Sequence, residues 1–274
     1  MGSAADALIA LHARKSAASV EKFHLEYPDR PVIVALTGTD LYRDIETSEE
    51  ARHAMRLASR LVVLQPEGIT RVARSLRAKT RVVYQSSDTR LPHRPPRNRF
   101  RIAVIGNLRE EKDPFRAAAA LAHLPGLDEI QVVQIGASLA PEMQALATRY
   151  ARRDSRYRWI GSRPHGDVMR RLAACHVLVV SSVMEGGANV ICEAARIGVP
   201  VLASRVSGNV GMLGAGYEGY FPLFDDRRLA RLIERARTDA AFYRSLKRSV
   251  AARRALFAPA AEKRGINRVL AEVT

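Results

Sequence analysis

The chain has 274 residues, of which 47% are hydrophobic, and this apolar content excludes a largely disordered protein. Lys and Arg number 44 against 28 Asp and Glu, a formal net charge of +16 that suits nucleic acid, an anionic membrane face or small phosphorylated ligands. The basic residues are scattered in pairs with little aromatic interleaving, so an arginine-rich solvated surface is the stronger interpretation. We therefore expect no nucleic acid among the partners.

The cysteines and the apolar runs indicate the cellular compartment of the protein. Cys175 and Cys192 have no metal-type spacing and no nearby array of histidines, so a zinc or iron site is not expected. A reducing cytoplasm is the default location for such a chain. No apolar run approaches the roughly 20 residues of a membrane span, and residues 1–15 lack a signal-peptide pattern.

Strand-like apolar runs alternate with amphipathic helical stretches along the whole chain. Such alternation predicts βαβ units, and hence an α/β fold with parallel sheets covered by helices. The strand-like runs are ALIALH, PVIVALT, RLVVLQ and RVVYQ in the first third, then FRIAVIGN, IQVVQIG, YRWIG, HVLVVSS, VPVLAS and GYFPLF. The helical stretches include SEEARHAMRLAS, DPFRAAAALAHL, PEMQALATRYARRD and HGDVMRRLAAC.

The segment SSDTRLPHRPPRNR interrupts this alternation with three prolines and no apolar periodicity, so residues 86–99 are predicted to link two domains. The first, residues 1–85, is short for a Rossmann-like domain and is expected to be incomplete, lacking an N-terminal βαβ segment, or reduced. The second spans residues 100–258, and residues 259–274 are predicted to form a helix that packs back toward the first domain. Ligands of open α/β sheets bind beyond the carboxyl ends of the strands, so the cleft between the domains is the expected site.

GNLREEKDP, residues 106–114, follows the strand FRIAVI and precedes a helix expected to begin near Pro114. Gly106 lets the backbone approach a ligand, while Arg109 and Lys112 offer positive charge to a phosphate. The plainer alternative is an ordinary strand-to-helix loop with a surface lysine.

EGGANVICE places two glutamates eight positions apart, with a helix expected to begin near Ala188. Gly186 and Gly187 permit a sharp turn that presents backbone N–H groups to a phosphate or sugar oxygen. Glu193 has apolar neighbours, so its carboxylate is either destabilising or bonded to hydroxyls. The alternative for Glu193 is an exposed helix carboxylate.

The GN-x4-KDP loop, the two glutamates and the strand GVPVLAS together resemble the C-terminal donor domain of GT-B glycosyltransferases, over residues 99–225. The resemblance implies that Glu193 accepts hydrogen bonds from the nucleotide ribose, that Glu185, Gly186 and Gly187 hold the sugar, and that Lys112 neutralises the diphosphate. The remaining donor-binding residues that it implies are Gly106, Asn107, Arg109, Ala188, Asn189 and Val190. Asn107 stands where many members carry arginine, and Arg109 is the expected substitute.

LHARKSA (residues 11–17) and LTGTDLYRDI (residues 36–45), taken with EGGANVICEA and SGNVGMLG, resemble the selenosugar synthases of selenoneine biosynthesis. This resemblance implies a GT-B fold of two Rossmann-like domains, with the N-terminal one shortened here. It also implies transfer of a sugar from a UDP-sugar, typically UDP-N-acetylglucosamine, to selenophosphate, which gives a 1-seleno sugar.

The acceptor side is expected on the first domain. His12, Arg14, Lys15 and Arg43 are candidates to hold phosphoryl oxygens, although Arg14 and Lys15 equally suit a solvated first helical turn. Asp40 is expected to act as a base or to orient His12, so the candidate catalytic residues are Asp40, His12 and Glu185. The remaining acceptor candidates are Thr37, Gly38 and Thr39, a loop for which helix capping by Thr39 or Asp40 is the alternative.

No metal-binding DxD triplet occurs in the cleft loops, so we expect a metal-independent enzyme with no cofactor. Two other functions remain open. One is a GT-B glycosyltransferase with a hydroxyl acceptor on a lipid or glycan, and the other is a truncated, non-catalytic donor-binding protein. A homodimer is possible, because a sheet without its full set of strands exposes an edge.

Overall fold

The computed structural model describes residues 5–273, and predictions about residues 1–4 and 274 lie outside that range. Within it the strands form two sheets, and every strand pair in both sheets is parallel. The predicted α/β class with two parallel sheets is confirmed. The first sheet has the order β1 (Leu8–Leu11), β2 (Val32–Leu36), β3 (Arg60–Val63), β4 (Thr80–Val82). The second has the order β10 (Tyr220–Phe221), β9 (Val201–Ser204), β8 (Val177–Val180), β5 (Phe100–Ile105), β6 (Ile130–Ile135), β7 (Tyr157–Trp159).

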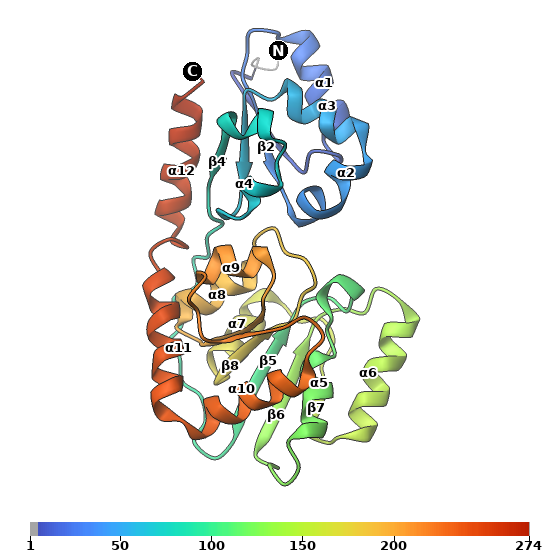
Figure 1. Cartoon of the computed structure of the whole chain (residues 1–274), viewed down its shortest axis with the longest axis vertical. Helices are drawn as coiled ribbons and strands as arrows, with labels where there is room; N and C mark the ends of the chain where they lie inside the picture. Colours follow the sequence, from blue (N-terminus) through green and yellow to red (C-terminus); the bar gives the residue numbers. More distant parts are fainter. Residues whose placement is uncertain (1–4, 274) are drawn as a thin grey trace.

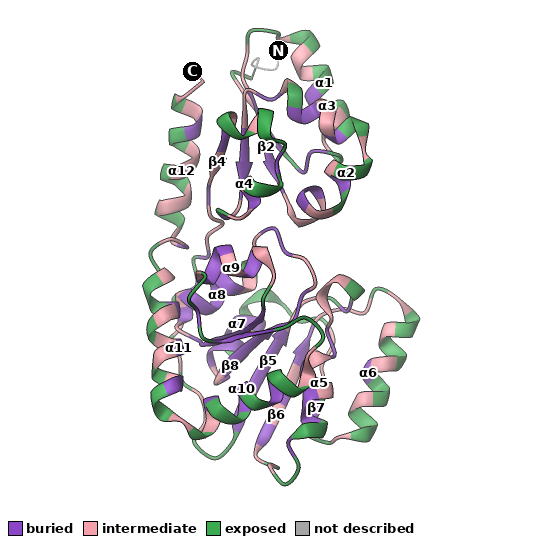
Figure 2. Cartoon of the chain, viewed as in Figure 1, coloured by how far each residue is buried: buried purple, intermediate pink, exposed green. Residues whose placement is uncertain are grey.

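Helices pack around both sheets and leave their polar faces outward (Figures 1 and 2). Their ends follow local sequence rules: Ser48 caps α3 through a bond from the Ala51 N–H, and α8 ends at Gly198 with φ 94°. The helices are α1 (Ala17–Glu26), α2 (Ile45–Thr47), α3 (Glu49–Leu57), α4 (Gly68–Arg71), α5 (Arg116–Ala120), α6 (Pro141–Arg153), α7 (His165–Ala173), α8 (Asn189–Ile197), α9 (Ser207–Leu213), α10 (Asp226–Thr238), α11 (Ala240–Arg253) and α12 (Pro259–Ala271). Shorter turns are η1 (Asp40–Asp44), η2 (Arg74–Lys79), η3 (Glu110–Lys112) and η4 (Leu121–His123).

The helix expected near Pro114 begins two residues later, at Arg116. Asp113 adopts a left-handed conformation with φ 41°, and its carboxylate accepts hydrogen bonds from the Arg116 guanidinium at 2.7 and 3.2 Å. The chain therefore turns once more before the helix starts. This extra turn directs residues 110–112 back toward the loop after β8, where the Val183 N–H donates to the Glu111 carbonyl at 2.9 Å.

The central strands of both sheets are buried (Figure 2), as expected of parallel sheets with helices on both faces. One large hydrophobic cluster surrounds the second sheet, and a smaller one fills the first sheet against α1 and α3. Between residues 5 and 273, no helix is long and apolar enough to cross a membrane.

Helix α12 lies beside β4 of the first sheet (Figure 1). Val269 is buried in a cluster with Ile33 and Val83, and Glu272 accepts hydrogen bonds from Arg60 and Arg81 at 2.9 Å each. The chain thus passes from the first sheet to the second through residues 83–99 and returns through residues 254–258.

The loops at the carboxyl ends of the two sheets touch through backbone atoms. A Cβ placed on Gly38 would lie 2.8 Å from the Gly186 backbone nitrogen, and one placed on Gly186 would meet the Gly38 nitrogen even more closely. Nearby, Tyr42 and Ser207 share a hydrogen bond of 2.7 Å between their hydroxyls. Side chains larger than hydrogen at these two glycines would separate the loops.

Gly186→Ala is therefore expected to lower the free energy of unfolding by about 1–3 kcal/mol, because its methyl group overpacks the contact with Gly38. Gly216→Ala is the matched control, since a Cβ there meets nothing within 4 Å, and its effect should stay within about 0.5 kcal/mol. Urea denaturation of both variants measures the difference. Equal stability of the two variants would contradict the tight contact.

Candidate active site

The order of the second sheet reverses between β5 and β8, and ligands of open α/β sheets bind at such a point. The loops after β5 and β8 face the loops after the strands of the first sheet across a cavity of about 310 Å³. The second sheet contributes Arg109, Lys112, Glu185, Gly186 and Gly187 to its lining. The first sheet contributes His12, Lys15, Thr37, Gly38 and Thr39. Predicted donor-side and acceptor-side residues thus share one cavity.

Lys112 and Glu185 form an ion pair at the second-sheet side of this cavity. The Lys112 ammonium lies 2.5 Å from Glu185 Oε1, which also accepts a hydrogen bond of 2.6 Å from the Ser182 hydroxyl. The Glu185 side chain is 9% exposed and that of Lys112 is 29% exposed. The backbone of Glu185 is also fixed, because Gly208 of α9 packs directly against its carbonyl. The Lys112 ammonium can therefore leave the fixed Glu185 carboxylate and pair with an anion that enters the cavity.

The predicted donor-binding residues of the loop after β5 point to different surroundings. Gly106 has φ 149°, a conformation that favours glycine. The amide oxygen of Asn107 accepts a hydrogen bond of 3.2 Å from the Ala137 N–H, and Asn107 does not line the cleft cavity. Arg109 does line it, so the structure places Arg109 rather than Asn107 toward the cleft.

Glu193 lies on α8, buried to 6% exposure and not among the residues that line the cleft cavity. Burial raises the pKa of its carboxyl from 4.5 to about 6, against the opposing effect of His165, whose Nδ1 lies 3.8 Å away. Asn189 donates a hydrogen bond of 3.2 Å to Glu193 Oε1. Ala188 caps α8 only through its backbone, and Val190 lines a small hollow with Lys112 and Glu185. Glu193 is thus a buried carboxylate with one hydrogen-bond donor, Asn189, and a more distant neighbour, His165.

His12, Asp40 and Asp44 gather at the first-sheet side of the cavity. His12 has φ 74°, held in place because its N–H donates to the Ala35 carbonyl at 2.9 Å. Its Nδ1 lies 2.7 Å from Asp40 Oδ1, and its Nε2 lies 2.9 Å from the Thr39 hydroxyl and 3.6 Å from Asp44 Oδ2. Both carboxylates are almost completely buried. Asp40 therefore lies in direct contact with the His12 ring, and its expected role as a base or as an orienting group stays a prediction.

The cationic acceptor candidates are less concentrated than the sequence suggests. Arg14 and Arg43 are each about half exposed and lie 3.6 and 3.4 Å from Asp44 Oδ1. Arg43 also reaches across the cleft to Glu111 Oε1 at 3.7 Å. Lys15 lines the cavity itself. The two arginines are thus partly balanced by acidic groups.

Sequence reasoning missed Asp44 and Glu111. Asp44 lies four residues after Asp40 in a π-helical turn, and this spacing on one helical face was the available signal. In the part of the chain that the structure describes, His12, Asp40 and Asp44 are the set whose ligand atoms all lie within 4.8 Å, close enough for one cation. Asp40 already accepts from the Thr37 N–H and hydroxyl and contacts His12, so a cation there would displace existing interactions.

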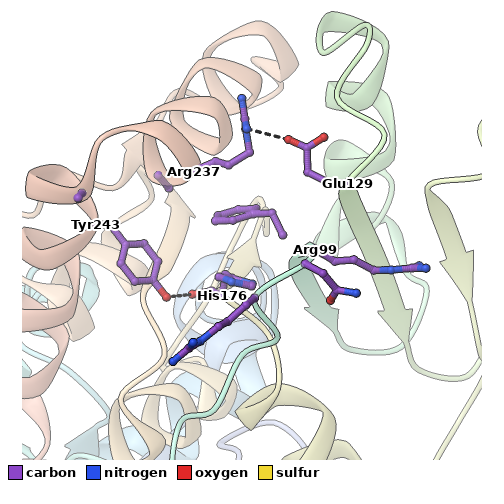
Figure 3. Close-up of a pocket in the computed structure, with 10 residues that line it drawn as sticks. Arg99, Glu129, His176, Arg237 and Tyr243 are labelled. Carbon is purple, nitrogen blue, oxygen red and sulfur yellow. Dashed lines mark hydrogen bonds and ion pairs between the residues drawn. The ribbon is translucent and has the colours of Figure 1, made fainter.

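Another cavity, of about 370 Å³, lies at the opposite, amino-terminal end of the second sheet (Figure 3). Arg99 and Arg237 extend in different directions there, and Arg237 is paired with Glu129 at 2.7 Å. Burial and neighbouring positive groups lower the pKa of His176 to about 4, so its ring is neutral. These side chains do not converge on a common point, and the cleft remains the candidate site.

Comparisons with known proteins show the family and the fold. Residues 86–253 match the family described as glycosyl transferases group 1. HepE of Anabaena, solved in complex with UDP, superposes with a TM-score of 0.82 at 19% identity, covering 97% of this chain and 79% of HepE. Sucrose-phosphate synthase from Thermosynechococcus elongatus gives 0.80 at 20% identity, covering 98% of this chain and 73% of that one.

The lipopolysaccharide outer core galactosyltransferase WaaB gives a TM-score of 0.73 at 16% identity, covering 98% of this chain and 76% of WaaB. Identities this low show a shared fold, and they confirm the predicted GT-B arrangement of two Rossmann-like sheets. The family match extends over more than half of the 274 residues. The chain therefore belongs to the glycosyl transferases of group 1.

Proposed function

We propose that this chain transfers a sugar, N-acetylglucosamine from UDP-N-acetylglucosamine, to selenophosphate and so forms the C–Se bond of a 1-seleno sugar. The observation that carries the proposal is the Lys112–Glu185 ion pair, which faces His12 and Thr39 across one cavity at the reversal point of the second sheet. The selenium acceptor itself rests on the sequence resemblance of the cleft loops.

The donor half follows from charge and geometry. The diphosphate of a UDP-sugar would draw Lys112 from Glu185, which leaves the Glu185 carboxylate to accept hydrogen bonds from sugar hydroxyls. Glu193 is buried with one hydrogen-bond donor, Asn189, and ribose hydroxyls would supply further hydrogen bonds. HepE has been solved in complex with UDP and with UDP-glucose, which supports a UDP-sugar donor.

The acceptor half uses the cations near the first sheet. Lys15 lines the cavity, and Arg43 lies 3.7 Å from Glu111 of its lining, so an anionic acceptor would find compensating charge. Selenium attacks the anomeric carbon while the bond from that carbon to the UDP oxygen breaks and UDP leaves. Hydrolysis of the Se–P bond by water then gives the seleno sugar and phosphate.

Two further features bear on the location of the protein in the cell and on its oligomeric state. Cys175 and Cys192 are both buried and free, which suits a reducing cytoplasm. Strand β1 forms an edge of the first sheet and exposes Ile9 and Leu11 to 42% and 68%, which suits a second copy as partner. Both the cytoplasmic location and the homodimer are proposals.

Lys112→Ala and Glu193→Gln should each weaken UDP binding by about 1.5–3 kcal/mol, or roughly ten- to 100-fold, because each removes a charge-assisted hydrogen bond to the ligand. Isothermal titration of UDP into each variant measures this. Arg231→Ala, an exposed position on α10, is the control and should bind as the unmodified chain does. Unchanged affinity in both site variants would refute the donor site.

Glu193→Gln should also stabilise the unliganded chain at pH 7.5 by about 2 kcal/mol. The pKa rises from 4.5 to about 6 on folding, so the folded state carries a penalty for the ionised carboxylate that is complete above pH 6. Below pH 4.5 the group is protonated in both states and the penalty disappears. Urea denaturation of both proteins at pH 7.5 and pH 4 should therefore reveal a gain at the higher pH alone.

Anaerobic incubation with UDP-N-acetylglucosamine, selenophosphate and EDTA should yield a 1-seleno sugar and UDP by mass spectrometry, at the same rate with and without the chelator. Loss of turnover in EDTA would instead assign a cation to the group formed by His12, Asp40 and Asp44. If product formed with a lipid or glycan hydroxyl but not with selenophosphate, the proposed selenium acceptor would be wrong and a hydroxyl acceptor would take its place. UDP binding without turnover on any acceptor would favour a non-catalytic donor-binding protein.

A further inference from the structure

A further cavity, of about 270 Å³, lies against one face of the second sheet, and among the described residues its lining shares none with the cleft cavity. Strands β5, β6 and β7 and the end of α7 surround it. Arg101, Gln131 and Arg158 each stand at the second position of their strand, so the cavity lies toward the amino ends of these strands. The cleft loops follow the carboxyl ends. A ligand in this cavity would therefore be separate from the donor.

The register of the three strands explains why these side chains share one face of the sheet. Arg101 of β5 pairs with Gln131 of β6, and Val133 of β6 pairs with Arg158 of β7. Side chains alternate between the two faces along a strand, so Gln131 and Val133 point the same way, as do their partners on the neighbouring strands. The alternation thus places two arginines around an amide and an apolar side chain.

Helix α6 covers the opposite face of this part of the sheet. Tyr157 of β7 is 2% exposed, and its ring centroid lies 6.2 Å from that of Tyr150 on α6. On the face that carries the arginines, Gln131 and Val133 remain partly exposed, although parallel sheets usually bury both faces. The cavity is thus an opening in the helical cover of the sheet.

Positive charge is in excess at this cavity. Arg101 and Arg158 reach it from the sheet, and Arg170 and Arg171 reach it from α7. Asp167 of α7 balances part of this charge, because it lies 2.8 Å from Arg171 Nε and 3.7 Å from an Arg170 nitrogen. In the described part of the chain, the guanidinium groups of Arg101 and Arg158 have no hydrogen bond or ion pair. Their donors are available to a ligand.

Two of these positive charges act on the same buried thiol. Cys175 lines the cavity, and burial raises the pKa of its thiol to about 12, while the charges of Arg101 and Arg171 oppose that rise. One of these arginines comes from β5 and the other from α7. A single exposed arginine is ordinary surface and needs no ligand. Arginines from separate elements around one cavity can hold an anion from several sides.

The rest of the lining favours an organic phosphate over a bare ion. Val133, Ile160 and Ala174 supply apolar surface, and the amide of Gln131 can donate or accept a hydrogen bond. The planar guanidinium group matches two oxygens of a phosphate. Small-molecule pockets begin at about 300 Å³, so a cavity of about 270 Å³ suits a small ligand.

We propose that this cavity binds a small organic phosphomonoester, with the phosphate between Arg101 and Arg158 and the carbon skeleton against Val133 and Ile160. The proposal uses no residue of the cleft and does not depend on the proposed donor or acceptor. It gives the chain a second ligand site, at the end of the sheet remote from the cleft.

Calorimetric titration of phenyl phosphate at pH 7.5, in a buffer free of phosphate, tests the site. Arg101→Ala and Arg158→Ala should each weaken binding about tenfold or more, because each removes a charge-assisted hydrogen bond. Arg152→Ala is the matched control, since it removes the same charge from an exposed position of α6 outside the cavity, and it should bind as the unmodified chain does. Arg158 is exposed and without side-chain bonds, so Arg158→Ala should leave the melting temperature unchanged.

The apolar part of the site is tested with inorganic phosphate as a second probe. Phenyl phosphate should bind about fivefold more tightly than phosphate, because Val133 and Ile160 bury part of the ring. Ile160→Ala should reduce this preference and leave the affinity for inorganic phosphate unchanged. Equal affinity of the unmodified chain for the two probes would overturn the assignment of an organic ligand.

Three other results would overturn the site itself. Equal losses in Arg152→Ala and Arg158→Ala would show general attraction to a chain of net charge +16. Absence of saturable binding to the unmodified chain would show that the arginines hold no anion. A loss in Lys112→Ala as large as that in Arg158→Ala would place the phosphate in the cleft. Normal binding of phenyl phosphate by a chain that does not bind UDP would overturn the proposed function alone.

Discussion

The backbone contact between Gly38 and Gly186 is the constraint on which the site depends. Each parallel sheet buries both of its faces under helices, so its chemistry is confined to the loops beyond the carboxyl ends of the strands. Those loops can form one cavity only if the two sheets meet at these ends. The glycine pair allows that approach without side chains between the loops. The ion pair of Lys112 and Glu185 and the hydrogen bonds of His12 lie on opposite sides of the cavity because of it.

The site also concentrates carboxylates in places that are unfavourable for stability. Glu193, Asp40 and Asp44 are all buried, and burial of an ionised group is destabilising unless partners compensate it. Asp40 is compensated by Thr37 and His12, whereas Glu193 has one amide partner and a pKa raised to about 6. Within this group, the carboxylate with the fewest protein partners is the one assigned to a ligand. Its unfavourable burial is the physical reason for that assignment.

The sequence predicted the elements more completely than the contacts between them. Each of the strand-like runs corresponds to a strand within residues 5–273, because buried parallel strands are short apolar runs bounded by turn residues. The helix start near Ala188 was likewise close to the observed α8 (Asn189–Ile197). Local patterns could not place Glu111, whose partner Arg43 comes from a distant segment. The spacing of Asp40 and Asp44 places both carboxylates on one helical face, but it does not show that both meet His12. For the same reason Asn107, adjacent to Gly106 in sequence, turned out to bond a neighbouring loop.

Helix α12 has a mechanical consequence for the cleft. Because the chain returns along α12, two covalent segments join the halves of the molecule, and they lie against each other: the Ser87 N–H donates to the Phe257 carbonyl at 3.1 Å, and the Tyr84 and Phe257 rings are 5.6 Å apart. A single connecting segment would let one half of the molecule rotate about it relative to the other half. Two connecting segments that lie side by side resist this rotation and allow only a hinge-like bend. The two adjacent connections therefore keep the cleft loops in register, with Gly38 opposite Gly186.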